Sequence, residues 1–257
     1  MKYIFNIILI YMMMIVIVQN VSASQTETDH ASWWIKTYGV LDPKHPLIPR
    51  VHEIFRKVNA AADKQSKHFP KLVILKSAGK HNALCLPDGS ILLIQKALTA
   101  CYANKNMSEG DSKMAFIIAH ELAHLSNGDF WQPPDKLPHE STSIDNHTYP
   151  PSMKDLFHHL EDDHIKEFHA DDFAIIYMTM AGYDPGVIVQ TKEKNFFQEW
   201  IVHCEANSSQ KSDTHPPPDQ RSEMIVMRIN DIINSMKAFE IGTRLYQLGK
   251  YKDSLVF

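Results

Sequence analysis

Two histidines placed four residues apart in an apolar segment constrain this chain more than any other feature of its sequence. His120 and His124 enclose Glu121, and Asp111 or Ser112 is placed to cap a helix that carries them. The apolar residues of this segment recur at helical spacing, at positions 114, 117, 118, 122 and 125. On a helix both imidazoles lie on one face and can bind one metal ion, while Glu121 leans toward a water on that ion. A structural metal site or two solvent-facing histidines are the alternatives.

A catalytic metal site needs a third protein ligand, and an acidic segment downstream offers several candidates. The segment Glu161 to Asp171 carries carboxylates or imidazoles at positions 161, 162, 163, 164, 167, 169 and 171. Glu167 and Asp171 lie four residues apart on one helical face, so one can bind metal while the other orients a ligand histidine. Glu167 is the preferred ligand and His164 is the next candidate. The other histidines of this region are expected to be solvated or partly packed: His158, His159 and His169.

The overall composition is that of a globular protein rich in histidine. Of the 257 residues, 44% are apolar, which is sufficient for a real core. The formal net charge is -4 and the charged residues are interspersed, so there is no basic stripe to follow a phosphate backbone. Nucleic acid is therefore excluded as a partner. The fifteen histidines make metal binding the first function to test.

The first 23 residues have the properties of a secretory signal peptide. Lys2 precedes an apolar run from Ile4 to Val18, and Val21-Ser22-Ala23 forms a small-residue cleavage site. We expect cleavage and export, to a bacterial periplasm or to the medium. A retained membrane anchor is the alternative, but a run of about fifteen residues is shorter than the roughly 20 that span a bilayer. Membrane contact is expected only through this segment, if it is uncleaved.

The first half of the mature chain contains the predicted β structure. Residues 32–49 are expected to be an irregular lead-in, followed by an amphipathic helix that ends near Ala62. Three β runs follow, at residues 71–76, 83–86 and 91–94. Pro87-Asp88-Gly89-Ser90 forms a hairpin turn between the last two runs. We predict a small antiparallel sheet.

The second half is predicted to be mostly helical. Gly128 to Pro151 is polar and proline-rich, which indicates a long surface loop that could act as a lid. Ser152 with Asp155 resembles a capping box that opens a long helix, which Gly182 to Pro185 ends. Further helices are expected near residues 186–203 and 219–239. The fold class is therefore α+β, mostly helical with a small antiparallel β-sheet.

The chain resembles the HtpX and type I CAAX prenyl protease family of zinc metallopeptidases, a gluzincin family, and particularly its exported, soluble, BepA-like branch. The resemblance covers about residues 71–229 and rests on five segments in the family's order. These are Asn82 to Gly89, His120 to His124, Glu167 to Asp171, Ala181 to Pro185, and Thr214-His215-Pro216 with Arg221. The resemblance implies a zincin-type metallopeptidase domain that binds one Zn2+ per subunit.

The resemblance also implies a role for each residue of the metal site. His120, His124 and Glu167 would be the zinc ligands. Glu121 would be the general base for the zinc-bound water, and Asp171 would stand behind a ligand histidine.

Two further residues gain roles only from this resemblance. Asn82 would lie on the edge strand beside the cleft, where a substrate peptide can add as an extra strand. His215 would return to the cleft from a loop and help to stabilise the oxyanion. The alternative for His215 is a loop histidine beside a run of prolines.

The C-terminus departs from the soluble members of this family. Residues 245–251 resemble the start of one tetratricopeptide repeat, and a single repeat cannot bury its own face. This segment must therefore pack on the peptidase domain or on a partner. We divide the chain into a signal peptide (1–23), a zinc metallopeptidase domain (24–237) and a helical, partly tetratricopeptide-like tail (238–257).

The cysteines imply no disulfide framework. Cys85, Cys101 and Cys204 are odd in number, so at least one thiol has no partner within the chain. Cys85 with Cys101 is the pair closer in sequence, and buried free thiols are the alternative.

These features predict a metalloendopeptidase that hydrolyses peptide bonds in exported polypeptides, such as misfolded or envelope proteins. Two other functions stay open. A non-catalytic zinc-binding or zinc-buffering envelope protein would use the many histidines as several weak sites. An inactive peptidase scaffold would bind unfolded proteins through its sheet edge. The physiological substrate and the oligomeric state are not predicted.

Overall fold

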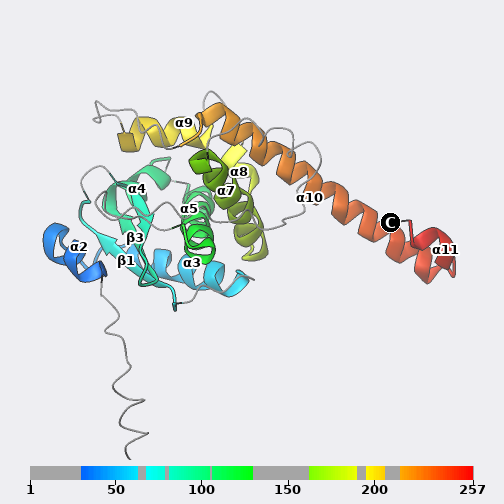
Figure 1. Ribbon diagram of the computed structural model, residues 1–257, viewed down its shortest axis with the longest axis horizontal. Coiled ribbons are helices and arrows are strands. Elements are labelled where there is room, and N and C mark those ends of the chain that lie inside the picture. Colours follow the sequence, from blue (N-terminus) through cyan, green and yellow to red (C-terminus); the bar gives the residue numbers. More distant parts are fainter. Residues whose placement is uncertain are drawn as a thin grey trace, which may run out of the picture.

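The computed structural model describes residues 30–62, 68–78, 81–104, 106–129, 162–189, 195–205 and 215–256. Its helices are α2 (His30–Tyr38), α3 (Ile48–Ala61), α4 (Gln95–Cys101), α5 (Met107–Asn127), α7 (Asp162–Met180), α8 (Gly186–Val189), α9 (Phe196–Trp200), the π-helix η1 (Ile201–Glu205), α10 (Pro218–Gln247) and α11 (Tyr251–Ser254). Its strands are β1 (Lys71–Leu75), β2 (Ala83–Cys85) and β3 (Ser90–Ile94). Figure 1 shows a mainly helical body with the sheet on one side. Helix α10 projects from this body, away from the sheet. The α+β fold class is confirmed.

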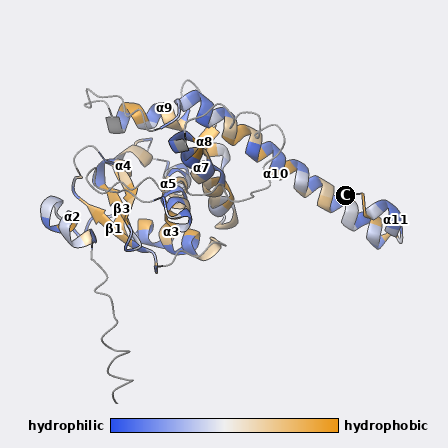
Figure 2. Cartoon of the chain, viewed as in Figure 1, coloured by the Kyte–Doolittle hydropathy of each residue, from blue (hydrophilic) through white to orange (hydrophobic). Residues whose placement is uncertain are grey.

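The sheet is mixed, which corrects the prediction that it is antiparallel. The strand order is β1-β3-β2, with β2 antiparallel to β3 and β1 parallel to it. The predicted hairpin turn between β2 and β3 is confirmed, and Gly89 adopts a φ of 84° there, which favours glycine. β3 is buried at all five positions and takes the centre, so β1 pairs with its other side. Figure 2 shows hydrophobic colours concentrated on these strands.

The lead-in predicted to be irregular contains helix α2, and this prediction was wrong. Ala31 and Trp34 are buried against residues of all three strands, including Leu75 and Leu84. The carboxylate of Asp88, in the distant hairpin turn, accepts a hydrogen bond of 3.1 Å from the backbone N–H of Ala31. This helix is therefore stabilised by tertiary contacts that local sequence cues do not report.

Helix α5 passes through the centre of the body and is buried along most of its length. A helix that is apolar or small on every side is buried on every side, and all residues from Met114 to Leu125 are buried. Helices α3, α4, α7 and α8 and strands β2 and β3 pack around it. The helix predicted to carry His120 and His124 is therefore present, and it places both histidines inside the fold.

The beginning of α5 differs from the prediction. Asn106 caps the helix by accepting a hydrogen bond from the backbone N–H of Glu109, five or six residues earlier than expected. Asp111 instead binds the guanidinium of Arg50, and the hydroxyl of Ser112 accepts a hydrogen bond from the backbone N–H of Asp184. Both predicted caps are therefore used to join α5 to other segments.

Helix α7 packs on α5 and ends where the sequence predicts. Gly182 follows the helix with a φ of 86°, and the backbone N–H of Tyr183 reaches back to the carbonyl of Met178. Several predictions fall outside the described residues. These are the signal peptide, the loop and possible lid at 130–151, and the capping box at Ser152 and Asp155.

The C-terminal part is dominated by α10, which spans 30 residues. The predicted boundary at residue 237 falls inside this helix. Cys85 and Cys101 are both buried free thiols, and the side chain of Cys204 lies outside the described part. No helix in the described ranges combines the length and apolarity that crossing a membrane requires.

Candidate metal centre

Two helices supply the side chains of the metal centre. His120, Glu121 and His124 come from α5, and Glu167 comes from the first half of α7. Apolar and small residues of α7, among them Ala170 and Ala174, pack in the same core as α5 and hold the helices together. The buried packing of two helices therefore fixes how Glu167 meets the two histidines.

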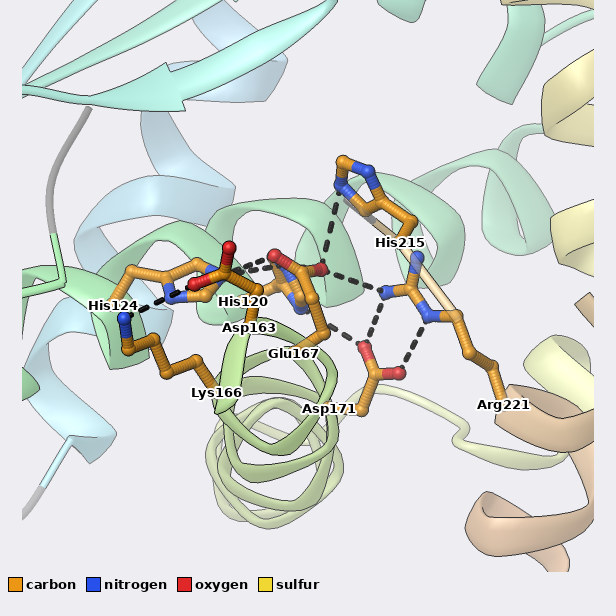
Figure 3. A network of polar contacts seen from close by, with 8 residues as sticks. All are labelled: His120, His124, Asp163, Lys166, Glu167, Asp171, His215 and Arg221. Carbon is orange, nitrogen blue, oxygen red and sulfur yellow. Dashed lines mark hydrogen bonds and ion pairs between the residues drawn. The ribbon is translucent and has the colours of Figure 1, made fainter. Parts of the chain in front are cut away.

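The three donor atoms converge on one point. The Nε2 atoms of His120 and His124 lie 3.0 Å apart, and each lies 3.4 Å from a carboxylate oxygen of Glu167. Among the described residues, this is a group of acidic, histidine or cysteine side chains whose ligand atoms all lie within 4.8 Å of one another. Figure 3 shows the three side chains pointing toward one another from α5 and α7.

This donor set fits a zinc ion. Ligand atoms about 2.0–2.1 Å from a tetrahedral ion are separated by roughly 3.3 Å, close to the separations just given. Oε2 of Glu167 is buried, and the nearest imidazole nitrogens of the described residues, from His120 and His215, are 3.4 Å away and make no hydrogen bond of good geometry with it. Two imidazoles and one carboxylate leave a fourth position for water or substrate, which is the arrangement of catalytic rather than structural zinc.

Asp171 orients the first histidine. Its carboxylate lies 2.9 Å from Nδ1 of His120, so Nδ1 carries the proton and Nε2 faces the other donors. Burial disfavours protonation of His120, but hydrogen bonds to Asp171 and Glu167 outweigh it and raise the pKa of His120 to about 10 in the metal-free protein. An imidazole that holds its protons this tightly also binds a metal cation well. The cation would take the place of the proton on Nε2, while the proton on Nδ1 stays on Asp171's side of the ring.

Arg221, from the first turn of α10, holds Asp171 in place. Its Nε and Nη2 atoms donate hydrogen bonds of 2.7 and 2.6 Å to the two oxygens of Asp171. The guanidinium lies 4.3 Å from the ring centroid of Phe197, and its side chain is only 11% exposed. Burial raises the pKa of Asp171, but the charge and hydrogen bonds of Arg221 outweigh it, so the pKa is lowered and the carboxylate stays ionised. No role was predicted for Arg221 from the sequence. This residue was noted only as part of the last of the five segments on which the family resemblance rests.

Glu121 is buried beside the donors without belonging to them. Burial raises the pKa of this carboxyl, and the charge of Glu167 adds to the effect. The positive groups of the site, including Arg221, act in the opposite direction. A carboxylate with a raised pKa takes up and releases a proton more readily near neutral pH, which suits a general base.

Glu167 has the opposite electrostatics. Burial alone would raise the pKa of this carboxyl, but hydrogen bonds from His120 and His124 outweigh it and lower the pKa well below its usual range. Two buried carboxyls of one site therefore have pKa values shifted apart. One remains an anionic ligand and the other can exchange a proton.

His215 lies at the mouth of the same site. Its Nε2 atom is 3.4 Å from Oε2 of Glu167, and its side chain is 49% exposed. Burial and the charge of Arg221 lower the pKa of His215, although Glu167 opposes the shift. The imidazole is therefore neutral near pH 7 and can donate one hydrogen bond toward the open side. Its predicted role at the oxyanion remains a prediction.

Asn82 precedes β2, which lies at one edge of the sheet beside α5. The carbonyl of Asn82 accepts a hydrogen bond of 3.0 Å from the backbone N–H of Ile94. Strand β2 packs against α5, the helix that carries Glu121 and the two histidines. Burial raises the pKa of the Cys85 thiol in β2, and the negative charge of Glu121 adds to this shift. The predicted position of an edge strand near the site agrees with this arrangement, while substrate binding there remains a prediction.

The other histidines of the acidic segment do not join the donors. His164, the second candidate ligand, lies one turn before Glu167 and outside the convergent group. His169 is partly buried, as expected, and His158 and His159 lie outside the described residues. Figure 3 shows Asp163 paired with Lys166 instead of with the metal donors, at 3.2 Å.

The comparisons with known proteins bear on the same helix. Residues 48–132 match the model of peptidase family M48. The matched range contains His120, Glu121 and His124 but stops before Glu167, which the fold brings to them. No curated protein matches the chain. M48 peptidases are zinc-dependent, so the match over this part of the chain and the three convergent donors both agree with a zinc metallopeptidase.

Proposed function

We propose that this protein is a zinc-dependent endopeptidase of the HtpX and type I CAAX prenyl protease group, from its exported, BepA-like branch. The convergence of His120, His124 and Glu167 beside the buried Glu121 carries the proposal. The substrates are internal peptide bonds of exported polypeptides, including misfolded or envelope proteins. A peptidase acts on polypeptides, and the edge strand β2 offers a place for an extended one.

Catalysis depends on proton transfer by Glu121. Zinc, when bound by the three donors, polarises the scissile carbonyl and lowers the pKa of water at the site to about 7. Glu121 accepts the proton of the attacking water and returns it to the leaving amide nitrogen. Its raised pKa suits both transfers, because it brings the carboxyl closer to taking up and releasing a proton near neutral pH.

The neighbouring groups position the reactants. Asp171 fixes the tautomer of His120, and Arg221 keeps Asp171 ionised. The neutral His215 donates a hydrogen bond to the oxyanion that develops on the former carbonyl. Main-chain groups at the edge of β2, next to Asn82, bind the substrate as an added strand.

The decisive experiment is digestion of unfolded casein by the parent and by Glu121→Gln, each with and without a chelator. The variant should keep stoichiometric zinc but lose cleavage by at least about 100-fold, since general acid–base catalysis contributes this much. Asp163→Asn, an exposed carboxylate on α7, is the control and should cleave normally. Undiminished digestion by Glu121→Gln would refute the proposal.

Zinc titration of the parent and of His120→Ala, together with casein binding by the parent, distinguishes the two other functions. A zinc-buffering protein would bind several equivalents that survive His120→Ala, whereas the endopeptidase binds one equivalent and loses it. An inactive scaffold would retain casein without cutting it, in the presence of a chelator. Within the described residues the single convergent donor group favours one site over several.

Export is part of the proposal and rests on residues 1–23. Expression of the full chain in a bacterium, followed by fractionation and N-terminal mass spectrometry, tests it. The mature protein should begin at Ser24 and lie outside the cytoplasm. A cytoplasmic protein that retains Met1 would contradict export but would leave the chemistry of the metal centre unaffected.

A further inference from the structure

The far end of α10 and the short α11 form an apolar projection, here called the C-terminal arm (residues 236–256). At the start of α10, Met224 and Ile225 are buried against the body. In the arm, large apolar side chains are exposed, from 44% for Ile241 to 87% for Leu255. The set is Met236, Phe239, Ile241, Tyr246, Leu248, Tyr251, Leu255 and Val256. Figure 1 shows the arm extending away from the sheet and the metal centre.

The shape of the arm brings the apolar side chains from Tyr246 onward to a tip. Gly249, with a φ of 73°, ends the α10 segment and lets the chain turn into α11, which packs back on α10. The rings of Tyr246 and Tyr251 meet edge to face across this turn, with centroids 5.1 Å apart. Leu248 lies in the turn and Leu255 just after α11, so these apolar groups gather at the end of the projection, whereas Met236 and Phe239 lie closer to α7.

The arm is basic although the protein as a whole is acidic. It holds Lys237, Arg244, Lys250 and Lys252 against Glu240 and Asp253, whereas the whole chain has a formal net charge of -4. Arg244 and Glu240 neutralise each other at 2.6 Å. The remaining three lysines and one aspartate give the arm a net positive charge. This charge lies next to exposed apolar and tyrosine side chains.

We propose that the C-terminal arm docks on an anionic phospholipid surface. Such surfaces attract clusters of lysine, accept apolar side chains at the boundary of the acyl chains, and favour tyrosine at the level of the headgroups. Lysine side chains can lie along the apolar surface while their ammonium groups remain among the phosphates. The proposal does not depend on zinc or on peptidase activity.

A second copy of the chain fits the arm less well. The apolar stripe of α10 has the three-and-four spacing of a helix-pairing seam, at positions 225, 229, 232, 236, 239 and 246. Thr243 occupies the seam position between the last two, and Gly242 weakens the helix there. The unpaired lysines of two arms would also repel each other. An anionic surface meets both the apolar and the charged groups.

The consequence is a peptidase held at a distance from the membrane. Arg221 of the metal centre lies in the first turn of α10, and the arm occupies the other end of the same helix. A helix of 30 residues is about 45 Å long. The site would therefore act on polypeptides near the bilayer surface and not within it.

Vesicle co-sedimentation tests the proposal with the chain from Ser24 onward, so that the signal segment cannot contribute. Binding to vesicles of equal parts phosphatidylglycerol and phosphatidylcholine should be at least about tenfold tighter than to phosphatidylcholine alone, and should weaken in high salt. Lys237→Gln/Lys250→Gln/Lys252→Gln should reduce binding to the anionic vesicles about tenfold or more. The matched control, Lys36→Gln/Lys44→Gln/Lys71→Gln, replaces three exposed lysines of the body and should bind like the parent.

The apolar contribution is tested separately. Leu248→Ser/Leu255→Ser should lose binding, and Phe69→Ser/Met107→Ser, with apolar side chains exposed on the body, should keep it. Because all these side chains are exposed, each variant should keep the parent's thermal unfolding temperature. Equal binding by parent and arm variants would overturn the proposal. So would sedimentation as a dimer that Leu248→Ser/Leu255→Ser converts to a monomer.

Discussion

Asp171 links the metal donors to the rest of the fold through a single carboxylate. It contacts Nδ1 of His120 at 2.9 Å and receives both hydrogen bonds of Arg221. Asp171→Asn keeps the size of the side chain but removes its charge, so His120 becomes a weaker ligand. We expect zinc affinity to fall about 10- to 100-fold, as for other partners of metal-bound histidines. Competition with a fluorescent zinc chelator measures the change.

The matched control for this change is Asp163→Asn on the same helix. Asp163 is 66% exposed and pairs with Lys166, so the zinc affinity of Asp163→Asn should equal that of the parent. Equal affinity in Asp171→Asn and Asp163→Asn would show that Asp171 does not orient His120.

Residue spacing predicted one part of this site and could not predict the other. Helical periodicity places Glu167 and Asp171 on one face, and both lie where that spacing put them. Arg221 contacts Asp171 across 50 positions of sequence, and no local pattern gives that distance. A buried carboxylate requires a partner, but the sequence alone does not identify it.

At the scale of elements, Gly110 decides how α4 and α5 approach each other. A side chain at this position of α5 would overlap the ring of Tyr102, which follows α4 and donates a hydrogen bond to Asp111. In an open helix, alanine in place of glycine stabilises by about 1 kcal/mol. Here we expect Gly110→Ala to destabilise the protein by about 1–3 kcal/mol, because overpacking shifts the ring. Urea unfolding measures the difference.

A double-mutant cycle isolates the cause. In the Tyr102→Ala background the ring is absent, so Gly110→Ala should cost less than in the parent and should approach the helix-propensity gain. If both backgrounds gave the same cost, the overlap with Tyr102 would not be the reason.

The elements that sequence patterns predicted are those whose stability is local. Helices α3 and α5 and the β2–β3 hairpin carry their own periodicity or turn residues, and they were predicted. Helix α2 depends on Asp88 and on burial of Trp34, and the parallel pairing of β1 depends on β3 taking the centre. Such features follow from tertiary packing, which overrides local preference.

The contact of α7 with α10 contains an acid that should make stability depend on pH. Asp172 of α7 lies 2.7 Å from Nε of Arg228 in α10 with its side chain 5% exposed. Burial raises the pKa of Asp172 to about 6, although Arg228 opposes the shift and Asp171 and Asp231 add to it. The folded protein therefore binds this proton more tightly than the unfolded chain, whose pKa is near 3.9.

The sign of the effect follows from this difference. Between pH 4 and 6 the native state holds more protons than the unfolded state, so the contribution of Asp172 to stability falls as pH rises and is flat above about pH 7. The free energy of unfolding of the parent, minus that of Asp172→Asn, should fall by about 1–3 kcal/mol from pH 4.5 to pH 7. Denaturant titrations of the metal-free proteins provide the measurement. A constant difference over this range would show that Asp172 is not buried as described.

At the scale of the whole molecule, the metal donors join the two helices on which the core is built. His120 and His124 belong to α5, Glu167 belongs to α7, and these helices pack together along the middle of the body. An ion bound to this group requires both helices in place, and the unfolded chain does not hold the donors together. Zinc binding should therefore stabilise the entire peptidase body and not only the residues around the site.

The size of this effect depends on the zinc concentration in a way that can be checked. At free zinc about 1,000 times the dissociation constant, mass action adds about 4 kcal/mol to the free energy of unfolding. The melting temperature should rise with each increase in zinc and return to the metal-free value with chelator. His124→Ala should lose this dependence, while His52→Ala, an exposed histidine of α3, should keep it. A melting temperature that responds to zinc equally in the parent and in His124→Ala would place the stabilising ion elsewhere, and the link between the donor group and the stability of the fold would be wrong.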